Sequence, residues 1–302
     1  MINKIKKEIF NYFPNYLNVD EKKIDEVIET AQEIRIRVGQ PIIVRNYMEE
    51  KEISCELKTE DILRILGNFS ENSIYSVQNE INSGFITIKG GHRVGISGTC
   101  VFEENVIKNI KYISSLNIRI AREIKNCSES ILKRIIENKK FDNTLILSPP
   151  GCGKTTIIRD MIRQLSNGSE SCNSYNIGLV DERSEIAAMY KGVPQNDIGA
   201  RTDVMNNCRK DVGMKMLIRS MGPQIIATDE IGGNNDEYAI MEANYSGVKL
   251  LLTAHGERIN DVSKNIIDSK LFKNIVILKN EIKPGELDKI YFLEGDKYVS
   301  SF

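Results

Sequence analysis

The stretch Ser148-Pro-Pro-Gly-Cys-Gly-Lys-Thr-Thr156 has the residue types and spacing of a phosphate-binding loop. It follows the apolar run Leu145-Ile-Leu147, which predicts a buried strand, and it precedes Ile157-Ile-Arg-Asp-Met-Ile162, whose apolar spacing predicts a helix. The glycines let the backbone curl so that its N–H groups face phosphate oxygens, assisted by the positive end of the following helix. Strand, glycine loop and helix in this order distinguish a P-loop from an ordinary turn with a solvated lysine.

The side chains of this loop predict how a nucleotide is held. Lys154 would supply a positive charge to the β- and γ-phosphates, and the Thr155 hydroxyl would reach Mg²⁺. Ser148 occupies the position of the usual leading glycine, which mainly shapes the turn. The residues that we expect to bind the nucleotide in this loop are Pro150, Gly151, Cys152, Gly153, Lys154, Thr155 and Thr156.

A second apolar run, Gln224-Ile-Ile-Ala-Thr-Asp-Glu230, ends in two adjacent carboxylates. In P-loop folds such a strand lies beside the first and presents its carboxyl end to the same crevice. Asp229 would then reach the Mg²⁺ shell, and Glu230 would be the general base that orients and deprotonates the attacking water. The alternative is a solvated acidic pair at a strand end. A nucleotide kinase would not need Glu230 in that place, so the pattern predicts ATP hydrolysis.

Two further strand ends carry polar side chains to the same edge. Asp181 and Glu182 follow an apolar run, where they could support Mg²⁺ or water, or else act as favourable acids at a helix N-terminus. Thr253 and His255 end the next run, and either could sense the γ-phosphate. A single histidine is more often structural, but its position over a nucleotide crevice favours a functional role.

Arginines in the first part of the chain form another candidate set. Arg35 and Arg37 share one face of a predicted strand because side chains alternate, and Arg122 and Arg219 are similar candidates. Each arginine alone is expected to be a solvated charge. Together they could bind phosphates of a facing domain or subunit, since guanidinium groups bind phosphate bidentately. The best candidates to contact the nucleotide are Arg93 and Arg119.

Composition excludes several classes of protein. With 302 residues the chain is long enough for two domains, and 41% hydrophobic and 27% charged residues are typical of a globular protein. A net charge of −1 gives no global attraction to nucleic acid or anionic membranes, and no apolar run approaches the roughly 20 residues of a membrane span. Six cysteines without a Cys-x-x-Cys pair and only two histidines argue against a zinc module and fit a reducing, cytoplasmic compartment.

The patterning changes along the chain at about residue 125. Residues 33–44, 84–96 and 115–121 alternate apolar and polar positions, with Gly90-Gly91 as a hairpin turn, and residues 61–67 have helical spacing. This predicts an N-terminal α+β domain, residues 1–125, with a substantially antiparallel sheet. A capped helix near 128–136 leads into an α/β domain, residues 126–302. Its expected strands are 144–148, 176–181, 223–228, 248–254 and 274–278, with a final hairpin near 289–300.

Several segments in order resemble the stage III sporulation protein AA family of endospore-forming bacteria. They include Val180-Asp-Glu-Arg-Ser-Glu-Ile186, Gly199-Ala-Arg-Thr-Asp203, Thr228-Asp-Glu-Ile-Gly232 and Thr253-Ala-His-Gly256, besides the P-loop and the N-terminal segments Glu33–Gly39 and Gly84–Gly95. That family is itself similar to the traffic ATPases of type II and type IV secretion. The resemblance therefore implies a RecA-like P-loop NTPase domain behind a smaller N-terminal α+β domain, an assembly into a homo-hexameric ring, and ATP and Mg²⁺ as ligands.

The resemblance also implies roles for residues and partners. Glu182 falls near the acidic box, Glu230 near the catalytic glutamate and His255 near the histidine box. Asp229 stands where the secretion enzymes usually have glycine, and their cysteine zinc module is absent here. The implied role is to power a secretion-like channel between mother cell and forespore, together with other stage III sporulation membrane-complex subunits. The protein would be cytoplasmic in the mother cell, peripheral to the forespore-engulfing membrane and without a membrane span of its own.

Two other functions remain open from the sequence. A nucleic-acid-stimulated ATPase of the RecA class uses the same core, although the near-neutral charge and the lack of an aromatic–basic stripe argue against nucleic acid. A nucleotide-dependent scaffold would switch on ATP occupancy without turnover, and Glu230 argues against it. Stimulation by single-stranded DNA, or by membrane-complex subunits, distinguishes the first alternative from the channel motor.

Overall fold

The computed structural model describes residues 2–17, 19–46, 48–71, 77–279 and 285–301. The chain forms two compact units. The N-terminal unit contains residues 1–122 together with 188–195, and the C-terminal unit contains residues 123–187 and 196–302. This division differs from the predicted domains 1–125 and 126–302 in residues 123–125 and in the short segment 188–195.

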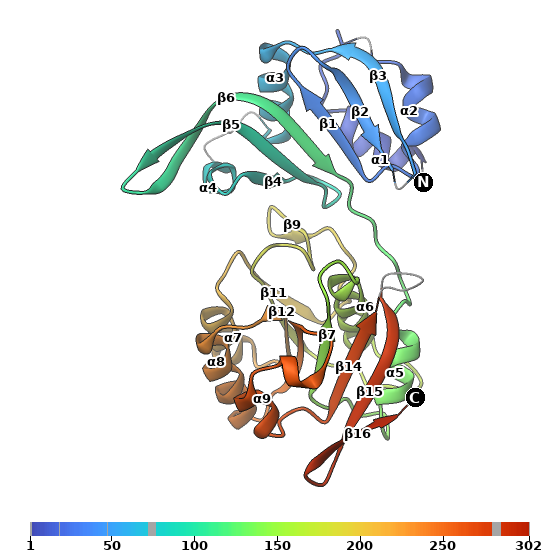
Figure 1. Ribbon diagram of the computed structural model, residues 1–302, viewed down its shortest axis with the longest axis vertical. Helices are drawn as coiled ribbons and strands as arrows, with labels where there is room; N and C mark the ends of the chain where they lie inside the picture. The colour runs from blue at the N-terminus through green and yellow to red at the C-terminus, as the bar shows by residue number, and fades with distance from the viewer. Residues whose placement is uncertain (1, 18, 47, 72–76, 280–284, 302) are drawn as a thin grey trace. The chain divides into compact units, whose positions relative to one another are not determined.

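The N-terminal unit is built on a six-stranded antiparallel sheet in the order β3-β2-β1-β6-β5-β4 (Figure 1). Strand alternation explains its two faces, since Ile34 and Ile36 are buried while Arg35 and Arg37 between and beyond them are not. The predicted strands and the Gly90-Gly91 turn, with φ of 89° and 79°, are confirmed. The strands are β1 (Glu33–Arg37), β2 (Pro41–Arg45), β3 (Glu50–Glu56), β4 (Phe85–Thr87), β5 (Arg93–Glu103) and β6 (Val106–Arg119).

Helices cover the apolar side of this sheet. Ile9, Ile24, Ile62 and Phe69 come from three helices and pack in one core with the inward residues of the strands. The helices are α1 (Ile2–Phe10), α2 (Glu21–Val27), α3 (Thr59–Phe69) and α4 (Gln78–Asn82). The hairpin of β9 (Met189–Tyr190) and β10 (Val193–Pro194) also belongs to this unit, where the Gln195 side chain accepts the Gly90 N–H at 2.9 Å.

The C-terminal unit has an eight-stranded sheet in the order β11-β8-β12-β13-β7-β14-β15-β16. Strands from β11 to β14 are parallel, and β15 and β16 add an antiparallel edge. All the predicted strands are present, whereas β11 was not predicted because its five residues are only partly buried. The strands are β7 (Thr144–Ser148), β8 (Ile177–Asp181), β11 (Thr202–Asn206), β12 (Ile225–Ile231), β13 (Lys249–His255), β14 (Asn274–Lys279), β15 (Glu286–Glu294) and β16 (Lys297–Ser301).

Both faces of the central strands are covered by helices (Figure 1). Leu145 and Leu147 of β7 pack with Met214 of α7 and Ile240 of α8, while α6 lies against β7, β12 and β13 and buries Ile157 and other apolar residues. The helices are α5 (Glu129–Ile135), α6 (Lys154–Asn167), α7 (Lys210–Met221), α8 (Asn234–Tyr245), the 3₁₀ turn η2 (Ile259–Asp261) and α9 (Lys264–Asp268). None of the described helices is long and apolar enough to cross a membrane.

Candidate active site

The phosphate loop connects β7 directly to α6, as predicted. Gly151 and Gly153 have φ of 77° and 80°, in the left-handed region that side-chain-bearing residues rarely adopt. Gly153 is the N-cap of α6, so the unpaired N–H groups at the start of this 14-residue helix face the same point as the loop. The local geometry is that of an anion cradle.

The Lys154 side chain, 6% exposed, folds back over the loop. Its Nζ donates to the carbonyl oxygens of Ser148 at 3.0 Å and of Pro149 at 3.2 Å, and lies 3.1 Å from His255 Nδ1. Burial lowers the pKa of Lys154, and the nearby carboxylates of Glu230 and Asp229 act in the opposite direction. Phosphate oxygens would compete with these neutral acceptors for the ammonium protons.

His255 connects the lysine to a carboxylate. Because an ammonium group can only donate, His255 Nδ1 accepts, and Nε2 carries the proton of a neutral ring. That Nε2 lies 3.5 Å from Glu230 Oε1, and the other oxygen of Glu230 accepts from Arg183 Nη1 at 2.5 Å. Lys154, His255, Glu230 and Arg183 therefore form one continuous polar chain, in which Arg183 was not predicted.

The Glu230 backbone is held in an unusual conformation. Its φ is 50°, and the pairing of β12 with β13 shifts register between Thr228 and Ile231, so Glu230 lies in a bulge. The Thr253 hydroxyl accepts the Glu230 N–H at 2.8 Å. A left-handed non-glycine residue costs of order 1–3 kcal/mol and persists only where its surroundings impose it. The predicted phosphate-sensing role of Thr253 is replaced by this support of the bulge.

Asp229 precedes the bulge and has no such support. It is 3% exposed, and its Oδ2 is a buried oxygen with no hydrogen-bond partner among the described residues. Burial, with the charges of Asp181, Glu185 and Glu230, raises its pKa to about 6. An orphaned buried carboxylate oxygen fits a cation site, and Mg²⁺ is usually held by one or two protein oxygens plus phosphates and waters.

The acidic pair Asp181 and Glu182 is divided between two tasks. The Asp181 carboxylate accepts the N–H groups of Glu185, Ile186 and Ala187, and burial raises its pKa. It fixes a turn, so neither the Mg²⁺ role nor the helix-capping role predicted for Asp181 is found. Glu182 accepts from Lys210 Nζ at 2.6 Å at the start of α7, outside the polar chain of Lys154, His255 and Glu230.

Comparison with known proteins identifies the family. Residues 5–298 match the family described as sporulation stage III, protein AA. The chain belongs to this family. It is 37% identical over 270 residues to the stage III sporulation protein AA of Bacillus subtilis, covering 88% of each chain. A plastid development protein of Arabidopsis thaliana, SEEDLING PLASTID DEVELOPMENT 1, is 32% identical over 165 residues, 53% of this chain and 23% of that protein.

Solved structures show the fold. The pilus retraction motor PilT with bound ADP superposes with a TM-score of 0.59 at 18% identity, covering 92% of this chain and 80% of that one. The Legionella pneumophila ATPase DotB gives 0.55 at 15% identity, covering 92% and 77%. The C-terminal unit of this family member thus has the RecA-like P-loop NTPase fold of the traffic ATPases, preceded by a smaller α+β unit, as predicted.

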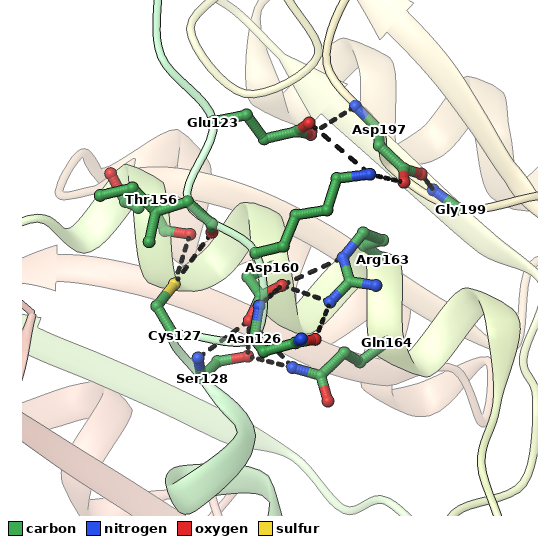
Figure 2. A network of polar contacts seen from close by, with 12 residues as sticks. Glu123, Asn126, Cys127, Ser128, Thr156, Asp160, Arg163, Gln164, Asp197 and Gly199 are labelled. Atoms are coloured by element: carbon green, nitrogen blue, oxygen red, sulfur yellow. Dashed lines mark hydrogen bonds and ion pairs between the residues drawn. The ribbon is translucent and has the colours of Figure 1, made fainter. Parts of the chain in front are cut away.

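A buried network supports α6 directly after the phosphate loop (Figure 2). The Asp160 carboxylate accepts the backbone N–H groups of Asn126 and Ser128, the Ser128 hydroxyl, and the side chains of Arg163 and Gln164, all between 2.7 and 3.0 Å. Burial opposes its ionisation, but these donors keep the pKa of Asp160 below its ordinary value. The network ties α6 to the entry of α5.

The same network includes the remaining loop threonine. The Thr156 carbonyl lies 3.8 Å from Cys127 Sγ, while Thr155 occupies the first turn of α6. The predicted nucleotide residues from Pro150 to Thr156 therefore share one loop and helix start.

Arg93 and Arg119 lie in the N-terminal unit. They are directly opposite each other on β5 and β6, and the Arg93 guanidinium carbon lies 3.5 Å from the centroid of the Phe85 ring. Cation–π contact of this kind fixes the Arg93 side chain on the outer face of the sheet. Their predicted contact with a nucleotide stays a prediction.

Proposed function

We propose that the chain is a Mg²⁺-dependent ATPase that serves as the motor subunit of a secretion-like channel complex between mother cell and forespore during endospore formation. The observation that carries the proposal is the continuous polar chain from the P-loop lysine through His255 to Glu230. It joins the group that holds a terminal phosphate to a carboxylate placed for acid–base work.

Each residue has a distinct role in hydrolysis. The loop N–H groups and Lys154 hold the β- and γ-phosphates. Glu230 orients the attacking water and accepts its proton, and the bulge and the Thr253 contact hold its carboxylate in position. His255, whose Nε2 proton faces Glu230, reports the presence of the terminal phosphate through its contact with Lys154. Mg²⁺, held by Asp229 and Thr155, would neutralise charge on the phosphates.

Glu182 has a less direct role in this proposal. Its carboxylate is paired with Lys210 rather than with the polar chain, so it acts by placing the start of α7 beside the carboxyl edge of the sheet. Its removal is therefore expected to affect turnover less than removal of Glu230.

The motor would work as a homo-hexamer on the cytoplasmic side of the membrane around the forespore. The family relationship supports the sporulation role, and the likeness to a pilus retraction motor supports conversion of ATP hydrolysis into movement. Arg93 and Arg119 would complete the site from the N-terminal unit. Other stage III subunits of the membrane complex would be the partners.

Steady-state hydrolysis of Mg·ATP by the purified chain tests this function. Turnover should be measurable in the wild type, and membrane-complex subunits should increase it. Glu230→Gln should bind ATP and stall, whereas Asp203→Asn, which removes an exposed carboxylate of β11, should turn over normally. Stimulation by single-stranded DNA alone would overturn the channel role in favour of a nucleic-acid motor.

A further inference from the structure

A cavity of about 630 Å³ lies beside the phosphate loop within the C-terminal unit. One wall is formed by Pro149 and Cys152 of the loop itself, and the opposite walls come from β14, from β15 and from the turn at Glu257 and Arg258. Its volume lies in the range of small-molecule sites, roughly 300–1,000 Å³. No role has been given to this cavity by the catalytic arrangement described above.

The order of the strands fixes which part of a nucleotide reaches this cavity. The neighbours of β7 are β13 on one side and β14 on the other, and β12 lies beyond β13 (Figure 1). Glu230 on β12 and His255 at the end of β13 place the terminal phosphate on the β13 side. A nucleoside triphosphate carries its nucleoside at the end opposite the terminal phosphate. Its nucleoside must therefore leave the loop toward β14 and β15.

The lining of the cavity suits a flat base and a ribose. Ile277 and Leu278 are buried apolar residues at the end of β14, and Tyr291 of β15 offers an aromatic face. Stacking on an aromatic side chain binds any base through its π-face. The carboxylates of Glu257 and Asp288 offer acceptors for ribose hydroxyls or an exocyclic amine.

The cavity wall is fastened to the phosphate loop. The Gly285 N–H, just before β15, donates to the Cys152 carbonyl at 2.7 Å. Gly285 has φ of 80°, and a Cβ there would come within 3.1 Å of Ile157 Cδ1 on α6. This close contact holds the start of β15 at a fixed distance from the P-loop, which preorganises the two subsites for one ligand.

We infer that this cavity is the nucleoside subsite of the enzyme, taking the base and ribose of a nucleoside triphosphate whose phosphates lie on the P-loop. The inference rests on the proposed function, because it assumes that Lys154 holds the phosphates. It adds that affinity for ATP over bare triphosphate is set by β14, β15 and the turn at Glu257 and Arg258.

Calorimetry with Mg²⁺ and two ligands, ATP and inorganic tripolyphosphate, separates the subsites. Tyr291→Ala should weaken ATP binding about tenfold while leaving tripolyphosphate binding unchanged. Retained tripolyphosphate affinity also shows that the variant is folded. Tyr238→Ala, which removes a tyrosine exposed on α8, is the matched control and should bind both ligands like the wild type.

Photolabelling of the wild type with 8-azido-ATP gives a second readout that needs no variant. The label should map to β14, β15 or the turn at Glu257 and Arg258. Labelling within residues 2–122, or equal ATP affinity of Tyr291→Ala and wild type, would overturn the nucleoside subsite. Both results leave the ATPase proposal standing, whereas failure of the wild type to bind either ligand would overturn the ATPase proposal itself.

Discussion

Replacement of Asp229 by asparagine is expected to make the folded protein insensitive to pH in the range where the wild type loses stability. Asp229 is buried, its Oδ2 has no described partner, and its pKa is raised to about 6 from an ordinary 3.8. The unfolded chain therefore ionises first as the pH rises. Between these two values the folded protein binds the additional proton, so its stability falls as the pH rises and the penalty is complete above pH 6.

The size of the effect follows from the two pKa values. Their difference corresponds to about 3 kcal/mol of unfolding free energy over the whole range. About 2 kcal/mol of this falls between pH 4.5 and 7.5. The amide of Asp229→Asn adds a constant offset from its own hydrogen bonding, but it does not titrate. The pH-dependent part of the difference between the two proteins is thus the quantity to measure.

Urea unfolding followed by far-UV circular dichroism, in EDTA and without nucleotide, measures this difference at several pH values. Asp229→Asn should gain about 2 kcal/mol relative to the wild type between pH 4.5 and 7.5. Asp203→Asn on the neighbouring strand β11 serves as the control. If the wild type and Asp229→Asn show parallel pH profiles, Asp229 does not carry an unrelieved buried charge, and the argument for a cation site at its Oδ2 fails.

Three further outcomes follow from the same structure. Glu230→Gln should slow turnover by about 10²–10⁴-fold with ATP affinity retained; unchanged turnover in single-turnover assays would move the general base to another carboxylate. Asp160→Ala should lower the unfolding free energy by about 3 kcal/mol in urea titrations because it strands Arg163 and several N–H donors, and an effect no larger than that of Asp203→Ala would refute the network's importance. Mixing Arg93→Ala or Arg119→Ala with Lys154→Ala subunits should restore part of the hydrolysis if the arginines act across subunits, whereas lost activity without rescue would place them in their own subunit's site.

The sequence predicted those parts of the structure that depend on local pattern. Leu145-Ile-Leu147 and Ile225–Ala227 are continuous apolar runs, which only a strand covered on both faces by helices can bury. The P-loop glycines were predictable because the loop needs left-handed backbone at Gly151 and Gly153. The meeting of Lys154, Glu230 and His255 followed from parallel strands ending at one edge.

The remaining features depend on contacts between distant segments. Nothing in the alternation of β12 signals the bulge at Glu230, because it is imposed by the Thr253 hydroxyl of the next strand. Likewise, the capture of Asp181 by the N–H groups of residues 185–187 depends on a turn without a distinctive sequence pattern. Arg183 looked like a surface charge until the fold placed it against Glu230.

The most direct test of the central claim is calorimetric titration of Mg·ATP into the wild type and into Lys154→Ala, with far-UV spectra as the check on folding. The account predicts measurable binding to the wild type and none to Lys154→Ala, because the lysine is the buried positive charge of the phosphate cradle. Equal ATP binding by a folded Lys154→Ala protein would contradict the assignment of this loop as the nucleotide site.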